Sequence, residues 1–181
     1  MPSTMSSPAS SRSNPRLFVA IPVVMEGYSE IRERFGPFLE GRWTDTEQLH
    51  LTLAFLDRRF DAVTAMRCLD RIALRFEPVT LSRLGYFPRN RIFHALAVHP
   101  SLHALAADAA SAFDLPRADI VPHVTLMRVK ALHDADRFRA LIENFATHPL
   151  GALLPECRLY ESTLHRDGTR HTVLKSWPRI F

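Results

Sequence analysis

Two short apolar stretches of the chain each carry a histidine that is followed two positions later by a threonine. Residues 48–56 read QLHLTLAFL, and residues 121–129 read VPHVTLMRV. In an extended strand, side chains two positions apart project from the same face. His50 should therefore lie beside Thr52, and His123 beside Thr125, while the leucines and valines between them point into a core. These four polar residues are the first candidates for chemistry.

Two imidazoles and two hydroxyls suit acid–base cleavage of a phosphodiester. Imidazole titrates near neutrality, so one ring can accept a proton while the other donates one, without a metal. The hydroxyls of Thr52 and Thr125, with a cation such as Arg128, could bind the phosphate oxygens. In a regular strand Arg128 points away from His123, so its contact with phosphate requires a bulge or the end of the strand.

Other catalytic classes are poorly supported. The chain has no HExxH motif, no acidic residue in a ligand-like position near either histidine, and no GxSxG elbow, and its six glycines leave little room for a phosphate-binding loop. We therefore expect no metal site and no cofactor. A single histidine on a strand is more often structural, so the hypothesis depends on the repeat. Three further strand histidines could line a shared cleft: His94, His165 and His171.

The elements around the two motifs also repeat. After each histidine strand comes a segment with helical spacing of its apolar residues, at 61–76 and 133–145, and then two strands joined by a turn. These hairpins are predicted at 79–99 and 152–177. The order indicates an internal duplication, whose halves would bring the two polar faces together across a cleft. A first strand is predicted at 16–22, and further helices at 28–40, interrupted by Gly36 and Pro37, and at 101–114.

Composition sets broad limits. The 181 residues are 46% hydrophobic and 23% charged, with a net charge of +4, which indicates one globular domain and mildly favours an anionic partner. Residues 1–15, rich in serine and proline, are expected to form a flexible tail before a single domain over 16–181. Cys68 and Cys157 show no metal or disulfide spacing, which fits a reducing cytoplasm. No apolar run is long enough for a membrane helix, so no membrane partner is expected.

The two motifs resemble the paired His-x-Thr-Leu signatures of the two-histidine (2H) phosphoesterases. Within that group the chain is most similar to the RNA 2′,3′-cyclic phosphodiesterases, historically called 2′-5′ RNA ligases. The resemblance extends from RLFVAIP through RWTDTEQLHLTLAFL and PHVTLMR to LYESTLHRDGTRHTVL, which is nearly everything after the tail. One departure is Asp57, where the family usually has glycine.

The resemblance implies an α+β fold of two similar lobes, each an antiparallel sheet backed by helices, with the active site between them. It implies that His50 is the proton donor to the leaving 3′ oxygen and His123 the proton acceptor that activates water, while Thr52, Thr125 and Arg128 bind phosphate. The partner would be an RNA or nucleotide with a 2′,3′-cyclic phosphate, cleaved to a 2′-phosphomonoester by a monomeric enzyme, with ligation as a possible side activity.

Two alternatives stay open at this point. One is a 2H phosphodiesterase that acts on another substrate, such as a cyclic phosphate of ADP-ribose or a 2′-5′ oligonucleotide. The other is a nucleotide- or RNA-binding module without turnover, against which the intact histidines and threonines argue. Tyr86, Phe87 and Phe93 could stack on a base, although packing in the core is the commoner use of such residues.

Overall fold

A computed structural model describes residues 14–116, 120–145, 149–166 and 168–180. The predicted tail falls outside these residues except for its last two. Of these, Asn14 exchanges two hydrogen bonds with Arg58. The Asn14 side-chain amide donates to the Arg58 carbonyl at 3.3 Å, and the Arg58 guanidinium donates to the Asn14 carbonyl at 2.8 Å. Among the described residues, no helix is long and apolar enough to cross a membrane.

The described part of the chain has nine strands, with α-helices between some of them. The strands are β1 (Arg16–Val24), β2 (Leu39–Trp43), β3 (His50–Asp57), β4 (Thr80–Phe87), β5 (Ile92–Ala97), β6 (His123–Leu132), β7 (Gly151–Leu153), β8 (Glu156–His165) and β9 (Gly168–Pro178). The α-helices are α1 (Tyr28–Phe35), α2 (Ala62–Leu69), α3 (Pro100–Ala112) and α4 (Ala135–Asn144).

The strands form a barrel-like antiparallel sheet. Following the pairings from β1 leads to β3, β6, β5, β4, β7 and back to β1. Strand β2 adds to β6, and the β8–β9 hairpin adds to β1. Because the path closes through a single pair between β3 and β6, Leu51 with Val124, the two histidine strands meet inside the fold.

Each hairpin pairs with a strand of the other half. The β4–β5 hairpin follows His50 in sequence, but β5 pairs with β6, which carries His123. The β8–β9 hairpin follows His123, but β8 pairs with β1, the neighbour of β3. Both hairpins were predicted from the sequence and are confirmed, and this exchange of partners joins the two halves into one sheet.

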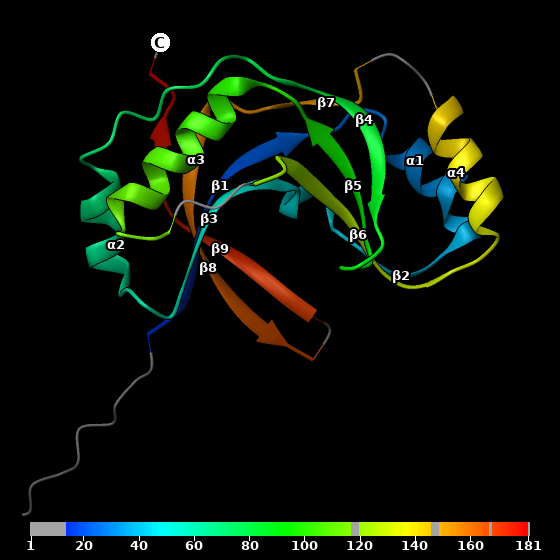
Figure 1. Cartoon of the computed structure of the whole chain (residues 1–181). Coiled ribbons are helices and arrows are strands. Elements are labelled where there is room, and N and C mark those ends of the chain that lie inside the picture. The colour runs from blue at the N-terminus through cyan, green and yellow to red at the C-terminus, as the bar shows by residue number, and fades with distance from the viewer. Residues whose placement is uncertain (1–13, 117–119, 146–148, 167, 181) are drawn as a thin grey trace, which may run out of the picture.

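Helices cover the sheet in two pairs (Figure 1), α2 with α3 and α1 with α4. Phe35 of α1 packs against Phe138 of α4, with ring centroids 5.8 Å apart, and both side chains are buried against Phe93 of β5. Most buried apolar side chains belong to one continuous core. The α+β class is thus confirmed, whereas the division into two lobes stays a prediction.

The sequence-based helix over 61–76 was too long. Asp61 caps α2 by accepting a hydrogen bond from the Thr64 amide, as expected for an N-cap, but the helix ends at Leu69. The chain then turns, and the Leu74 carbonyl accepts a hydrogen bond from the Ile180 amide at 3.1 Å. Apolar periodicity continues through this segment because its side chains still pack on the core, so the periodicity alone could not show where the helix stops.

Candidate active site

The two histidine motifs face each other across the β3–β6 pair. Leu51 and Val124 are partners in an antiparallel register, which sets His50 across from Thr125 and Thr52 across from His123. All four side chains are half-buried, while Leu51 and Val124 between them are fully buried on the opposite face. The predicted polar quartet is therefore brought together at one place.

Both histidine rings are anchored in the same way. Nδ1 of His50 lies 2.7 Å from the carbonyl oxygen of Gln48, and Nδ1 of His123 lies 2.7 Å from that of Val121. A carbonyl oxygen can only accept, so Nδ1 must carry a proton in both rings. Nε2 is consequently the nitrogen that each ring has available for proton transfer.

A β-bulge follows each motif and changes which side chains share the histidine face. On β3, Ala20 pairs with Thr52 and Val19 pairs with Ala54, so Leu53 is an extra residue. On β6, His94 pairs with Thr125 and Phe93 with Met127, so Leu126 is the extra residue. Two consecutive residues face the core at each bulge.

The bulges bring Arg128 and Phe55 onto the histidine face. From the sequence, Arg128 was expected to need a bulge in order to reach the phosphate, and β6 has one at Leu126. The charge of Arg128 acts on both His50 and His171. Phe55 holds the equivalent position on β3 and is 72% exposed. Its ring lies 6.2 Å from Phe18, which itself lies 5.0 Å from His50. Phe55 was not among the residues predicted from the sequence, although alignment of HLTLAF with HVTLMR pairs it with Arg128.

Each histidine of the motifs has a second histidine edge-on to it. His171 of β9 lies 5.2 Å from His50, at an interplanar angle of 87°. His94 of β5 lies 5.6 Å from His123, at 72°. Both were candidates for lining the cleft, and both contact the site. The third, His165, is exposed and contacts Thr163 at 3.0 Å, away from these rings.

Burial favours the neutral form of His50, His94 and His171. Burial lowers the pKa of His50 to about 4, with smaller contributions from His171, His123 and Arg128, opposed by the hydrogen bond to Gln48. Burial also lowers the pKa of His94 to about 4. The pKa of His171 is lowered by burial and then by Arg128. The site is thus a cluster of imidazoles beside a guanidinium, which favours binding of an anion.

The three aromatic residues considered for base stacking occupy different environments. Phe93 is fully buried, and Tyr86 packs edge-on against Phe138 at 5.8 Å. Phe87 stacks on His94 at 3.8 Å and lies 5.1 Å from His123. Only Phe87 of these three contacts a histidine of the site.

Asp57, where glycine was expected, has a positive φ of 51°. This left-handed conformation favours glycine and is tolerated by aspartate. The carboxylate accepts a hydrogen bond from Arg16 Nε at 3.1 Å, on the exposed side. The departure therefore affects the turn after β3 and leaves the histidine face unchanged.

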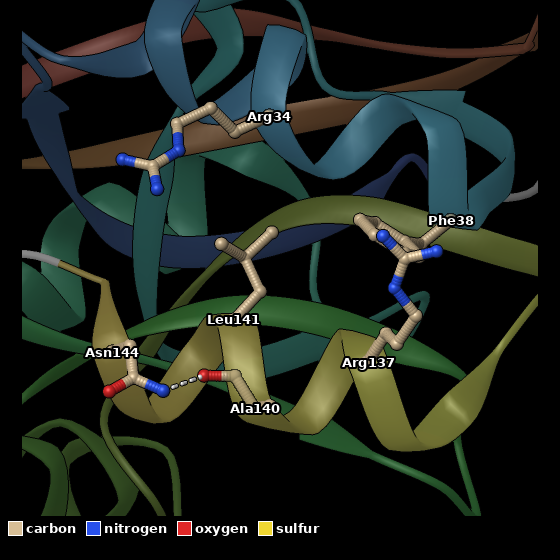
Figure 2. A pocket seen from close by; sticks show the side chains of 6 residues that line it. All are labelled: Arg34, Phe38, Arg137, Ala140, Leu141 and Asn144. Atoms are coloured by element: carbon tan, nitrogen blue, oxygen red, sulfur yellow. Dashed lines mark hydrogen bonds between the residues drawn. The ribbon is translucent and has the colours of Figure 1, made fainter.

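A groove of about 460 Å³ lies elsewhere, between α1 and α4 (Figure 2). Its lining residues come from the helices and the turn after α1: Arg34, Phe38, Arg137, Ala140, Leu141 and Asn144. Arg34 and Arg137 stack over Phe145 and Phe38, at 5.1 and 6.0 Å from the ring centroids. No residue of β3 or β6 lines this groove, so we place the candidate chemistry at the histidines.

Known proteins resemble this chain over most of its length. A family described as LigT-like phosphoesterases matches residues 21–94. The RNA 2′,3′-cyclic phosphodiesterase of Thermotoga maritima is 27% identical over 88% of this chain and 92% of its own. The protein of the same name from Methanocaldococcus jannaschii is 25% identical over 90% of this chain and 99% of its own.

Solved structures extend the similarity to three dimensions. Escherichia coli LigT in complex with 3′-AMP has a TM-score of 0.70 and 27% identity, over 93% of this chain and 99% of its own. LigT in complex with ATP has a TM-score of 0.66 and 30% identity, over 91% and 98%. A likeness over nearly the full length of both proteins cannot come from two short motifs alone, and the chain belongs to the LigT-like phosphoesterases, a family of 2H enzymes.

Proposed function

We propose that the protein hydrolyses 2′,3′-cyclic phosphate ends of RNA to 2′-phosphomonoesters. The observation that carries this proposal is the pair of imidazoles, each with Nδ1 tied to a backbone carbonyl and Nε2 available on one shared face. The curated relatives bear the name of this activity, and LigT has been solved with nucleotides. The substrate is a ribose phosphate, so an anion-binding site lined by hydroxyls suits it.

In the proposed reaction, water attacks phosphorus as the bond from phosphorus to O3′ breaks. Nε2 of His123 takes the proton from water, and Nε2 of His50 gives a proton to O3′. The hydroxyls of Thr52 and Thr125 donate to the non-bridging oxygens. Arg128 balances the negative charge that grows on them in the transition state. The product carries a 2′-phosphate and a free 3′-hydroxyl.

Turnover of an oligoribonucleotide with a 2′,3′-cyclic phosphate end, in EDTA, tests this proposal. We expect a 2′-phosphate product, identified by ³¹P NMR, and losses of roughly 10²- to 10⁴-fold in His50→Ala and His123→Ala. His103→Ala, an exposed position on α3, serves as the control. Absence of turnover by the unaltered protein would favour a binding module, and loss in EDTA reversed by a divalent ion would contradict the metal-free reaction.

A substrate with a nitrophenolate leaving group separates the two roles. Such a group departs without needing a proton, so removal of the acid should matter little and removal of the base should matter as before. His50→Ala should therefore be partly rescued on this substrate, and His123→Ala should not. The opposite pattern would exchange the roles of the two histidines.

A further inference from the structure

His171 lies at the active site, beside His50. Its ring stands edge-on to His50 at 5.2 Å and to Phe18 at 4.8 Å. The charge of Arg128, on the opposite strand β6, acts on His50 and His171 alike. Because the His50 and His171 rings lie 5.2 Å apart, an anion bound at His50 would also lie close to His171.

Gln48 holds the backbone of His171 in this place. The Gln48 side chain accepts a hydrogen bond from the His171 amide at 2.9 Å and donates one to the His171 carbonyl at 3.3 Å. The Gln48 main-chain carbonyl meanwhile accepts from His50 Nδ1. One residue thus positions both rings, although β9 and β3 are not neighbours in the sheet. Because the anchoring is through the backbone, it does not require the imidazole.

The two nitrogens of His171 have different surroundings. Nδ1 is shielded from solvent and has no hydrogen-bond partner among the described residues, whereas Nε2 is not shielded in this way. A proton on Nδ1 would bury an N–H without an acceptor, which proteins avoid. The neutral ring therefore carries its proton on Nε2, the reverse of the arrangement in His50. The Nε2–H of His171 is therefore a hydrogen-bond donor on a ring that stands beside that of His50.

We propose that His171 is a third histidine of the reaction, whose neutral Nε2–H donates a hydrogen bond to a non-bridging oxygen of the phosphodiester, on the side of His50. This role rests on the proposed function and gives the site a donor besides Thr52, Thr125 and Arg128. His94 does not have the same role beside His123. His94 is 2% exposed and stacks on Phe87, so its ring is part of the packing around His123.

Substitutions that keep one nitrogen at a time test the proposal. Glutamine places an amide nitrogen near the position of Nε2, and asparagine places one near Nδ1. We expect His171→Gln to retain kcat/KM within a few-fold, and His171→Asn and His171→Phe to lose roughly ten- to a hundredfold. His103→Gln is the matched control. Equal activity of the glutamine and asparagine variants, or a fully active phenylalanine variant, would overturn the proposal.

A spectroscopic measurement on the unaltered protein tests it without turnover. ¹⁵N NMR of the His171 ring at pH 7 should show a neutral ring with its proton on Nε2, and sulfate should shift that resonance. A proton on Nδ1, or no response to sulfate, would contradict the donor role. Failure of the protein to cleave RNA ends would contradict the proposed function alone, because neither the tautomer nor its response depends on catalysis.

Discussion

His50 poses a physical problem for its proposed role as an acid. Burial holds its pKa at about 4, so the ring of the free protein is neutral near pH 7. The groups that act on its charge are themselves neutral or positive: His171 on β9, and His123 and Arg128 on β6. A bound phosphate would bring the negative charge that the pocket does not supply, and would raise the pKa of His50. The substrate therefore promotes the protonation of its own acid.

Anion binding should consequently take up a proton. Sulfate keeps its charge between pH 4 and 8, so calorimetry in buffers of different ionisation enthalpy reports protons bound by the protein. We expect uptake of up to about one proton near pH 6, because the pKa of His50 rises from its low value toward neutrality. By linkage, sulfate affinity should increase as pH falls from the bound-state pKa toward 4. His50→Gln should abolish most of the uptake, and uptake unchanged in this variant would assign it to another group, such as His171.

At the residue level, strand parity in the sequence identified His50, Thr52, His123 and Thr125, and the structure brings them together. Which residues share a face of a strand depends only on their spacing in the sequence, so it can be read from the sequence directly. The placement of His171 and Gln48 could not be predicted in this way. They are 123 positions apart and meet through hydrogen bonds from the Gln48 side chain to the backbone of His171. Such bonds do not depend on the side chain at position 171, so the sequence does not reveal them.

At the level of elements, the two bulges have the largest effect on the site. Each adds one residue after the threonine, and this single residue reverses the parity of the positions that follow it, Phe55 on β3 and Arg128 on β6. The sequence indicated that Arg128 would need a bulge to reach the phosphate, but a bulge depends on the partner strand. Strand β2 was not predicted, and β7 was predicted only as the beginning of one longer strand from residue 152. They are five and three residues long, too short to show a period.

Two cations on β6 test the effect of the bulge. Arg128 and Lys130 are both exposed and share a face, but Lys130 lies farther along the strand, 3.3 Å from Glu40. Arg128→Met should lose a charge-assisted contact with phosphate, worth roughly 1.5–3 kcal/mol or about ten- to a hundredfold in kcat/KM. Lys130→Met should stay near the unaltered rate, because an exposed ion pair contributes little. Similar losses in both variants would indicate a diffuse basic surface in place of a phosphate contact.

At the level of the whole molecule, each hairpin pairs with a strand of the other half, and this determines whether one half can fold without the other. The repeated order of elements indicated two similar halves, and this order is present in the structure, with the additional strand β7 before the second hairpin. The order does not show which strand each hairpin pairs with, because the same elements could pair within one half or between the two halves. In the structure, β5 pairs with β6 and β8 with β1, so each half completes the sheet of the other.

Neither half should therefore fold alone. A fragment of residues 1–116 keeps β1 and β3, which still pair with each other, but loses β6 and β8. The fully buried Val19 and Leu51 would then lie on strands that have each lost at least one partner. We expect each fragment, 1–116 or 117–181, to lack cooperative thermal unfolding by circular dichroism when purified alone. Co-expression of the two should restore both the unfolding transition and the cyclic phosphodiesterase activity, since the pairings need no covalent link between α3 and β6. A cooperative transition in the isolated 1–116 fragment would show that the halves are independent domains, and that the active site forms by their docking after each has folded.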